Sequence, residues 1–194
     1  MSEALLAARK EYRPYMQDLA PEMEELRERM PIQRAGWRIQ TKADQQDFQG
    51  VLDGKGQWEE VQLPHYGAPV GKATTFYRMC FDLTESMASK DAIYLCFKGV
   101  DYKAAVYVNY RFVGSHEGFF APFEFQITDF VREKDNVLLV VVENDAVHSD
   151  GGEKIYAATG LGFDDSKVGW HHCPPGMGIY QEVYVEGRSA VSIA

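Results

Sequence analysis

The feature that most constrains the fold is an alternation of apolar and polar residues with a period of two, which begins near Trp37 and continues along the rest of the chain. Successive side chains of a β-strand point to opposite faces, so this period is typical of strands with one buried face. In residues 93–98, Ile93, Leu95 and Phe97 alternate with Tyr, Cys and Lys. Clusters of Gly, Pro, Asp and Asn separate such runs and predict strands at 58–63, 76–83, 93–98, 104–108, 112–116, 123–127, 137–143, 179–186 and 190–193.

Two further properties of these runs indicate how the strands are arranged. Residues 137–142 are all aliphatic, so we expect a central strand that is covered on both faces. No helical crossover of the kind that joins parallel strands separates the runs, so we expect antiparallel sheets. About eight or nine strands in about 150 residues fit an all-β fold, namely a two-sheet β-sandwich of jelly-roll type.

The segment before the strands has a helical period. Apolar residues at spacings of three or four form one stripe, which consists of Leu5, Ala8, Tyr12, Tyr15 and Leu19. Pro21 suits the first turn of a second short helix, which is predicted to extend to Met30. We therefore expect a short helical N-terminal extension over residues 1–35 and one sandwich domain over residues 36–194.

Charge and composition exclude several classes of protein. The 194 residues include 20 Lys and Arg and 29 Asp and Glu, and the net charge of −9 repels phosphate backbones and anionic lipid headgroups. The longest aliphatic run has six residues, far fewer than the roughly 20 of a membrane-spanning helix. We therefore expect neither nucleic acid nor a membrane as a partner. The apolar residues 4–8 are too short for the core of a signal peptide, so we expect a cytoplasmic protein, or a periplasmic one if an export signal lies outside this sequence.

The stretch from residue 145 to residue 178, called the excursion below, interrupts the strand pattern. It contains seven glycines and one short β-like run at 154–159. Long irregular segments in compact domains are usually functional or disordered. The aromatic side chains of Trp170, His171 and His172 argue against disorder, so we expect the excursion to have a function.

Histidines and cysteines raise the question of metal or nucleophile chemistry. His171 and Cys173 offer zinc ligands, but no second ligand pair follows at zinc spacing, so we expect no metal. Cys80 and Cys96 lie in predicted strands, where we expect them to be buried and inert. Composition alone leaves a cysteine nucleophile or a Ser-His-Asp triad open, although no nucleophile elbow occurs. The phosphate-binding glycine loop is absent too, and we expect no cofactor.

Several segments, in order and at similar spacing, resemble one known family. The most specific are Phe-Tyr-Arg-Met-Cys-Phe at 76–81, Leu-Cys-Phe-Lys-Gly-Val-Asp-Tyr at 95–102 and Val-Tyr-Val-Asn at 106–109. Further matching segments lie at 58–65, 113–118, 122–128, 136–140 and 178–183. Together they resemble the N-terminal sugar-binding domain of glycoside hydrolase family 2, which contains β-galactosidases, β-glucuronidases and β-mannosidases. The resemblance covers most of residues 58–186 and is specific for the family but not for the sugar.

This resemblance implies a galactose-binding-like β-sandwich at the front of a larger retaining glycosidase. In the family an immunoglobulin-like domain and a catalytic (β/α) barrel follow, and the barrel carries both catalytic glutamates. A barrel alone takes about 250 residues, so we expect this chain to be an accessory domain without a catalytic residue, acting on a β-glycoside only within the full-length enzyme. Two other functions stay open. They are an autonomous carbohydrate-binding module and a purely structural assembly domain.

The resemblance also points to substrate-binding residues in the excursion. In family β-galactosidases an aspartate from the loop before the closing Gly-Ile-aromatic strand reaches the galactose hydroxyls. Here Asp164 or Asp165 precedes the corresponding residues 178–180, with Trp170 between. These three residues are therefore the expected sugar-binding residues. Without the resemblance, the two adjacent acids are interpreted equally well as solvated surface charge.

Five positions bear on local geometry. Tyr110 stands in place of the glycine of an Asn-Gly turn, and Phe119 and Gln126 replace a Gly and an Asp that are common in the family. We expect these departures to change turn geometry and surface polarity more than the fold. Gly99 and Gly114 fall between β-runs, where we expect glycine to provide a positive φ.

Overall fold

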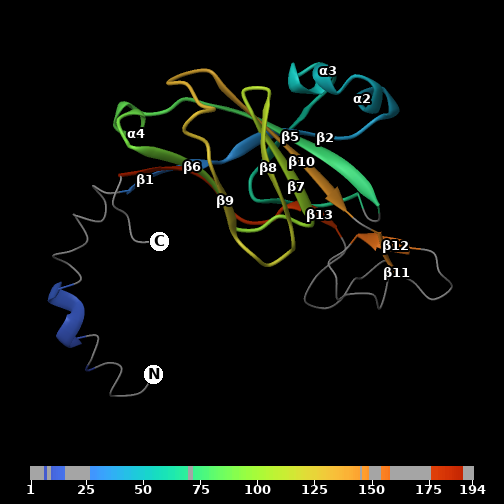
Figure 1. Cartoon of the computed structure of the whole chain (residues 1–194). Coiled ribbons are helices and arrows are strands. Elements are labelled where there is room, and N and C mark those ends of the chain that lie inside the picture. Colours follow the sequence, from blue (N-terminus) through green and yellow to red (C-terminus); the bar gives the residue numbers. More distant parts are fainter. Residues whose placement is uncertain are drawn as a thin grey trace.

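The computed structural model describes residues 7, 10–15, 27–69, 72–144, 146–148, 154–157 and 176–189. Within these ranges the paired strands run antiparallel and form two main sheets (Figure 1). The molecule is therefore the all-β sandwich that the alternation predicts.

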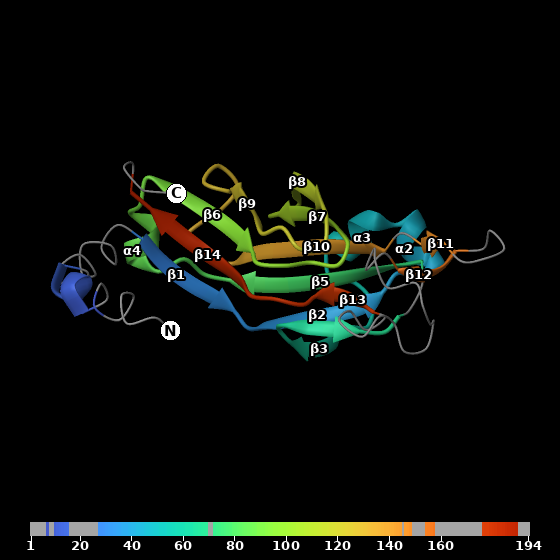
Figure 2. The same ribbon diagram turned by 90° about the horizontal axis from the view of Figure 1, so that it is seen from below.

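The smaller main sheet has the strand order β1-β14-β6-β9. Its strands are β1 (Arg27–Ile32), β14 (Val183–Arg188), β6 (Ala92–Phe97) and β9 (Phe123–Gln126). Figure 2 shows β14 between β1 and β6. The first and last of these strands along the chain are thus direct neighbours.

The larger main sheet has the order β3-β2-β5-β10-β7-β8. Its strands are β3 (Glu59–Gln62), β2 (Arg34–Ile39), β5 (Ala73–Phe81), β10 (Asn136–Asn144), β7 (Lys103–Val108) and β8 (Arg111–Glu117). Two small two-stranded sheets complete the fold. One pairs β4 (His65–Gly67) with β13 (Met177–Ile179), and the other pairs β11 (Ala146–His148) with β12 (Lys154–Ala157).

The main core lies between the two large sheets. On β6 the side chains that join the main core are those that the alternation predicts, namely Ile93, Leu95 and Phe97. On β14 the alternate residues Val183 and Val185 join the same core. Each strand therefore gives one face to the core and the other to the outside of the sandwich.

The central strand β10 is covered on both faces, as its aliphatic sequence predicts. Its even-numbered residues from Leu138 to Val142 belong to the main core. Leu139 and Val141 belong to a second apolar cluster, together with residues of α3 (Phe48–Leu52). Polar N-caps start α2 (Lys42–Gln46), α3 and α4 (Glu85–Ala88), namely Thr41, Asp47 and Thr84.

The helix that the sequence predicts from Pro21 to Met30 is wrong over its last part, because residues 27–32 form β1. This strand pairs with β14 in a register that runs from Arg27 opposite Arg188 to Ile32 opposite Val183. A distant partner thus decides the conformation, since the segment is too short for its own propensity to prevail. β2 and β4 also go unpredicted, and residues 180–182 divide the predicted strand 179–186 into β13 and β14. The predicted strand at 190–193 lies outside the described residues.

The described residues contain no candidate for a membrane-spanning helix. None of their helices has the length and apolar character that crossing a bilayer requires.

Candidate functional site

Four segments that are distant in sequence meet at one end of the sandwich. They are β4, the β6–β7 connection, the end of β10 and β13. β13 pairs with β4, and the backbones of Asp101 and Gly178 exchange two hydrogen bonds of 2.9 and 3.1 Å. At the end of β10, the Asn144 side chain donates a 3.0 Å hydrogen bond to the carbonyl of Gly176. Both ends of the excursion are therefore fixed beside Asp101.

Asp101 has a buried carboxyl group whose hydrogen bonding is incomplete. The residue is 0% exposed, and the Tyr66 hydroxyl donates to Oδ2 over 3.0 Å. In the part of the chain that the structure describes, Oδ1 has no hydrogen-bond partner. Burial raises the pKa of Asp101 to about 7, against the smaller opposing effect of the Tyr66 hydrogen bond. A ligand that donates a hydrogen bond would supply what Oδ1 lacks, because a buried unpaired acceptor is costly.

Gly178 is the residue that lets β13 approach this closely. Its φ of +139° lies in a region that residues with a side chain rarely adopt. A Cβ atom there would lie 2.7 Å from the hydroxyl oxygen of Tyr77. That hydroxyl is hydrogen-bonded to Nδ1 of His65 at 2.8 Å. Burial raises the pKa of Tyr77 and lowers that of His65, so both groups are neutral near pH 7.

A row of aromatic rings leads from Asp101 to the surface. The ring of Tyr66 meets that of Tyr180 edge-on, with centroids 6.2 Å apart. Tyr180 stacks on Phe119 at 4.5 Å and 9°, and Phe119 meets Phe120 edge-on at 4.5 Å. Phe120 is 65% exposed. The row therefore joins a buried acid to an exposed aromatic side chain.

Gly99 and Gly114 are glycines for a different reason from the one expected, because neither has a positive φ. A Cβ on Gly99 would lie 2.5 Å from the ring of Tyr180, and a Cβ on Gly114 would lie 2.5 Å from the ring of Phe125. Both positions thus permit a close approach of an aromatic ring. Positive φ values occur instead in the turn between β7 and β8, at Asn109 (48°) and Tyr110 (70°).

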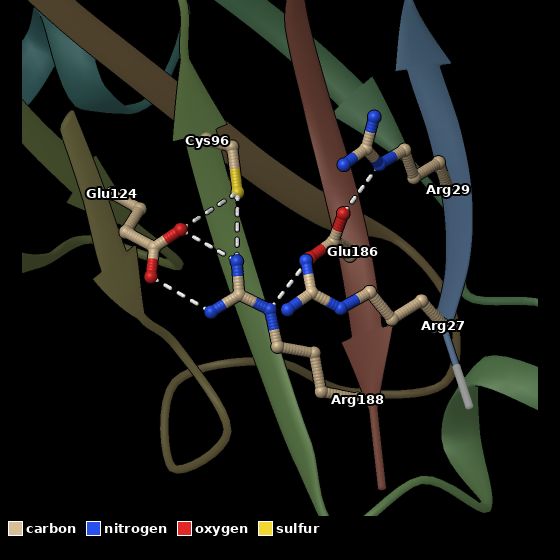
Figure 3. A network of polar contacts seen from close by, with 6 residues as sticks. All are labelled: Arg27, Arg29, Cys96, Glu124, Glu186 and Arg188. Atoms are coloured by element: carbon tan, nitrogen blue, oxygen red, sulfur yellow. Dashed lines mark hydrogen bonds and ion pairs between the residues drawn. The ribbon is translucent and has the colours of Figure 1, made fainter. Parts of the chain in front are cut away.

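A second polar centre lies on the outer face of the four-stranded sheet (Figure 3). Glu186 is 0% exposed, and its two carboxylate oxygens accept hydrogen bonds from Arg188 Nε at 2.6 Å and Arg29 Nε at 2.5 Å. The two terminal nitrogens of Arg188, Nη1 and Nη2, also donate to the carboxylate of Glu124, over 2.7 and 2.5 Å. Arg27 lies 3.6 Å from Glu186.

Both carboxylates of this network are paired with arginines. The hydrogen bonds from Arg188 lower the pKa of Glu124, and those from Arg188 and Arg29 lower the pKa of Glu186 although its burial acts in the opposite direction. Cys96 lies in the same network, and burial, followed by the charge of Glu124, raises the pKa of its thiol to about 12. Because its carboxylates are already paired, the network is suited to holding strands together, whereas the Asp101 end retains an unpaired oxygen for a ligand.

The structure tests only some of the residues that the sequence singles out. Asp164, Asp165 and Trp170, the predicted sugar-binding residues, and His171 to Cys173 lie outside the described residues. Within the described ranges no group of three or more His, Cys, Asp or Glu could hold a metal ion. Sequence reasoning passed over Asp101, although a lone acid between two apolar runs, 92–97 and 104–108, was a usable signal.

Comparison of the sequence with known proteins finds matches to glycosyl hydrolases. The family model described as glycosyl hydrolase 2 galactose-binding domain-like matches residues 65–161, which is half of the chain. A β-galactosidase of Thermoanaerobacter pseudethanolicus is 33% identical over 101 residues, which cover 47% of this chain and 14% of that protein. A β-galactosidase of Clostridium acetobutylicum is 38% identical over 91 residues, which cover 44% of this chain and 10% of that protein.

Solved structures extend the similarity at the level of the fold. The β-glucuronidase of Ruminococcus gnavus in complex with D-glucuronic acid superimposes with a TM-score of 0.63 at 16% identity, over 84% of this chain and 30% of that chain. An uncultured Clostridium sp. β-glucuronidase gives a TM-score of 0.63 at 17% identity, over 86% of this chain and 30% of that chain. The chain thus spans a small part of the length of the proteins it matches.

Proposed function

The chain belongs to the glycosyl hydrolase 2 galactose-binding domain-like family, and from this we propose that it serves as the sugar-binding accessory domain of a retaining β-glycosidase, most closely a β-galactosidase. The observation that carries the proposal is the carboxyl group of Asp101. It is buried, it has one oxygen without a partner, and it stands where both ends of the excursion meet.

The chemistry of a sugar complements this site. A carboxylate accepts hydrogen bonds from hydroxyl groups, and charge-assisted bonds are stronger than neutral ones. A sugar hydroxyl placed at Oδ1 would replace the missing donor and stabilise the ionised form of Asp101. Tyr66 holds the other oxygen, so the carboxyl group is already oriented before the sugar binds.

In this proposal the domain binds and orients the sugar, and the bond-breaking carboxylates belong to another part of the enzyme. Hydrolysis of a glycosidic bond requires two carboxylates about 5 to 10 Å apart. No hydrogen bond or ion pair joins Asp101 to a second acid within the described ranges. The curated relatives support this division of labour, because the match covers only 14% and 10% of their length.

The excursion is proposed to complete the same sugar site. Asn144, which precedes it, and Gly176, near its end, are joined by a hydrogen bond close to Asp101. Asp164 or Asp165, with Trp170, would then supply further acceptors and an apolar surface to the sugar. The support for this assignment is the position of the two ends of the excursion together with the resemblance to the family.

The test measures kcat/KM of the complete glycosidase with an aryl β-galactoside. Asp101→Asn keeps the shape of the side chain but removes the charge, and we expect a loss of about ten-fold to a hundred-fold. Asp129→Asn, an exposed acid in the turn after β9, is the matched control and should change the ratio less than two-fold.

Asp164→Ala and Asp165→Ala, made separately, test the excursion. If neither changes kcat/KM by more than about two-fold, these acids have no part in the sugar site. If Asp101→Asn also changes kcat/KM by no more than about two-fold, the proposed function of the domain is wrong.

One observation favours a second function, that of an autonomous carbohydrate-binding module. Tyr110 and Phe112 expose aromatic side chains beside the larger sheet, and such rings can stack on sugars. Isothermal titration of the chain with galactosides, glucuronides and mannosides separates the two functions. Binding with a millimolar or lower Kd supports the module. The absence of measurable binding supports an accessory or purely structural domain.

A further inference from the structure

The connection between β8 and β9 carries two adjacent phenylalanines, Phe119 and Phe120. Phe119 is half-buried against Tyr180, whereas Phe120 leaves 65% of its surface in solvent. A single exposed apolar residue is ordinary on a protein surface. Phe120 differs because it ends a continuous row of rings that starts beside Asp101.

The connection is tied to the segment that bears Asp101. The hydroxyl of Tyr180 donates a hydrogen bond to the carbonyl of Phe119, and the ring of Tyr180 rests against Gly99. The amide of Gly118 donates to the carbonyl of Tyr102 over 3.1 Å. Figure 1 shows the β8–β9 connection at the same end of the sandwich as β13. Phe120 and Asp101 therefore lie on backbone segments that hydrogen bonds connect to one another.

An exposed aromatic ring that a row of rings connects to a carboxyl group suits a pyranose ligand. The hydroxyls of a sugar bind carboxylates, whereas its C–H faces pack on aromatic rings, so both kinds of group are needed to hold it. Because Phe119 and Tyr180 already fix the base of Phe120, little freedom is lost on binding. Asp101 is buried and Phe120 is exposed, so the two positions fit two successive rings rather than one.

We propose that Phe120, supported by Phe119 and Tyr180, stacks on a second pyranose ring, the one joined to the sugar that Asp101 holds. This inference rests on the proposed function and adds a preference for disaccharides over glycosides with a small leaving group. Phe120 contacts the ligand, and Tyr180 is a positioning residue that holds the connection in place.

The experiment compares two substrates of the complete glycosidase, lactose and methyl β-galactoside. Phe120→Ala should lower kcat/KM for lactose about ten-fold and leave the value for methyl β-galactoside within two-fold. Phe120→Tyr keeps a ring and should retain most of the activity on lactose. Ile39→Ala removes an apolar side chain that is 45% exposed at the end of β2, and this matched control should change neither value.

Three results would overturn the inference. They are an unchanged kcat/KM for lactose in Phe120→Ala, an equal loss on both substrates, and a lowered melting temperature of the complete enzyme with unchanged kinetics, which would place Phe120 against another domain. Each leaves the proposed function intact as long as Asp101→Asn reduces activity on both substrates. A wild-type enzyme that hydrolyses neither substrate contradicts the proposed function, and the inference then fails with it.

Discussion

Asp101 shows how a single residue can lower stability in order to serve a ligand. Its pKa is raised to about 7, so the folded state holds the proton more tightly than the unfolded chain does. The stability that the neutral acid contributes is complete below about pH 4 and is lost as the pH rises through 7. Near pH 7 the protein therefore keeps a buried, partly ionised Asp101 whose Oδ1 lacks a hydrogen-bond donor. A buried acid with a shifted pKa is typical of binding sites.

Replacing Asp101 by Asn should remove this pH dependence. The free energy of unfolding of the wild type should fall relative to that of the variant between pH 4 and pH 7. The difference should change by about 1.4 kcal/mol per pH unit, to a total on the order of 4 kcal/mol. Urea unfolding at several pH values measures the difference, and the acids with lowered pKa cancel because both proteins contain them. A constant difference across this range would show that Asp101 is ionised throughout.

The two described cysteines should differ sharply in reactivity. Cys96 is buried beside Glu124 and its pKa is raised to about 12, as its strand position predicts. The prediction that Cys80 is buried is wrong, because it lies on the exposed face of β5. Cys80→Ser should therefore abolish a fast phase of thiol titration in the native protein, and Cys96→Ser should leave it unchanged. An equal fast phase in Cys80→Ser would contradict the orientation of β5.

At the scale of the strand, β14 divides its two faces between apolar and ionic contacts. Val183 and Val185 pack in the core, whereas Glu186 and Arg188 on the other face bind residues of β1 and β9. Ionic contacts thus join three of the four strands of the smaller sheet across its outer surface (Figure 3).

Arg188→Met should destabilise the protein because it leaves Glu186 buried with fewer partners. Breaking a buried pair in this way costs about 3 to 5 kcal/mol, which urea unfolding at pH 7 measures. The pKa values of Glu124 and Glu186 are lowered, so the network stabilises the protein above about pH 4.5 and the loss should shrink as the pH falls and these acids become protonated.

The matched control is Arg34→Met. Arg34 pairs with Glu60 at 3.3 Å in full solvent, where an ion pair is worth less than about 1 kcal/mol. If both variants lose the same amount, the network contributes no more than an ordinary surface pair.

The elements that the sequence predicts are those whose pattern is set locally. Alternation locates β6, and a continuous aliphatic run locates β10, each within one residue of its observed ends. β1 escapes prediction because Met30 and Ile32 gain their burial from β14, far along the chain. Asp101 escapes for the same reason, since the contacts that bury it and orient it come from Tyr66 on β4 and from Gly178 on β13.

At the scale of the whole molecule, the chain by itself should not cleave a glycoside. We expect the purified chain to hydrolyse no aryl glycoside, because both catalytic carboxylates are proposed to lie in another domain. Release of the aryl group over many hours measures this, with the complete glycosidase as positive control. Turnover that disappears when one of the chain's own acids is replaced would contradict the expectation.

The pairing of β1 with β14 affects how the chain folds as it is synthesised. All strands of the six-stranded sheet lie between residues 34 and 144, so that sheet can assemble before β14 leaves the ribosome. β1 and β6 must wait for β14, which fills the place between them and binds Arg29 across 157 positions of sequence. Until then both strands present open edges, which favour mispairing with other chains, and closing so long a loop is slow. The nascent domain is therefore most prone to aggregation just before β14 emerges.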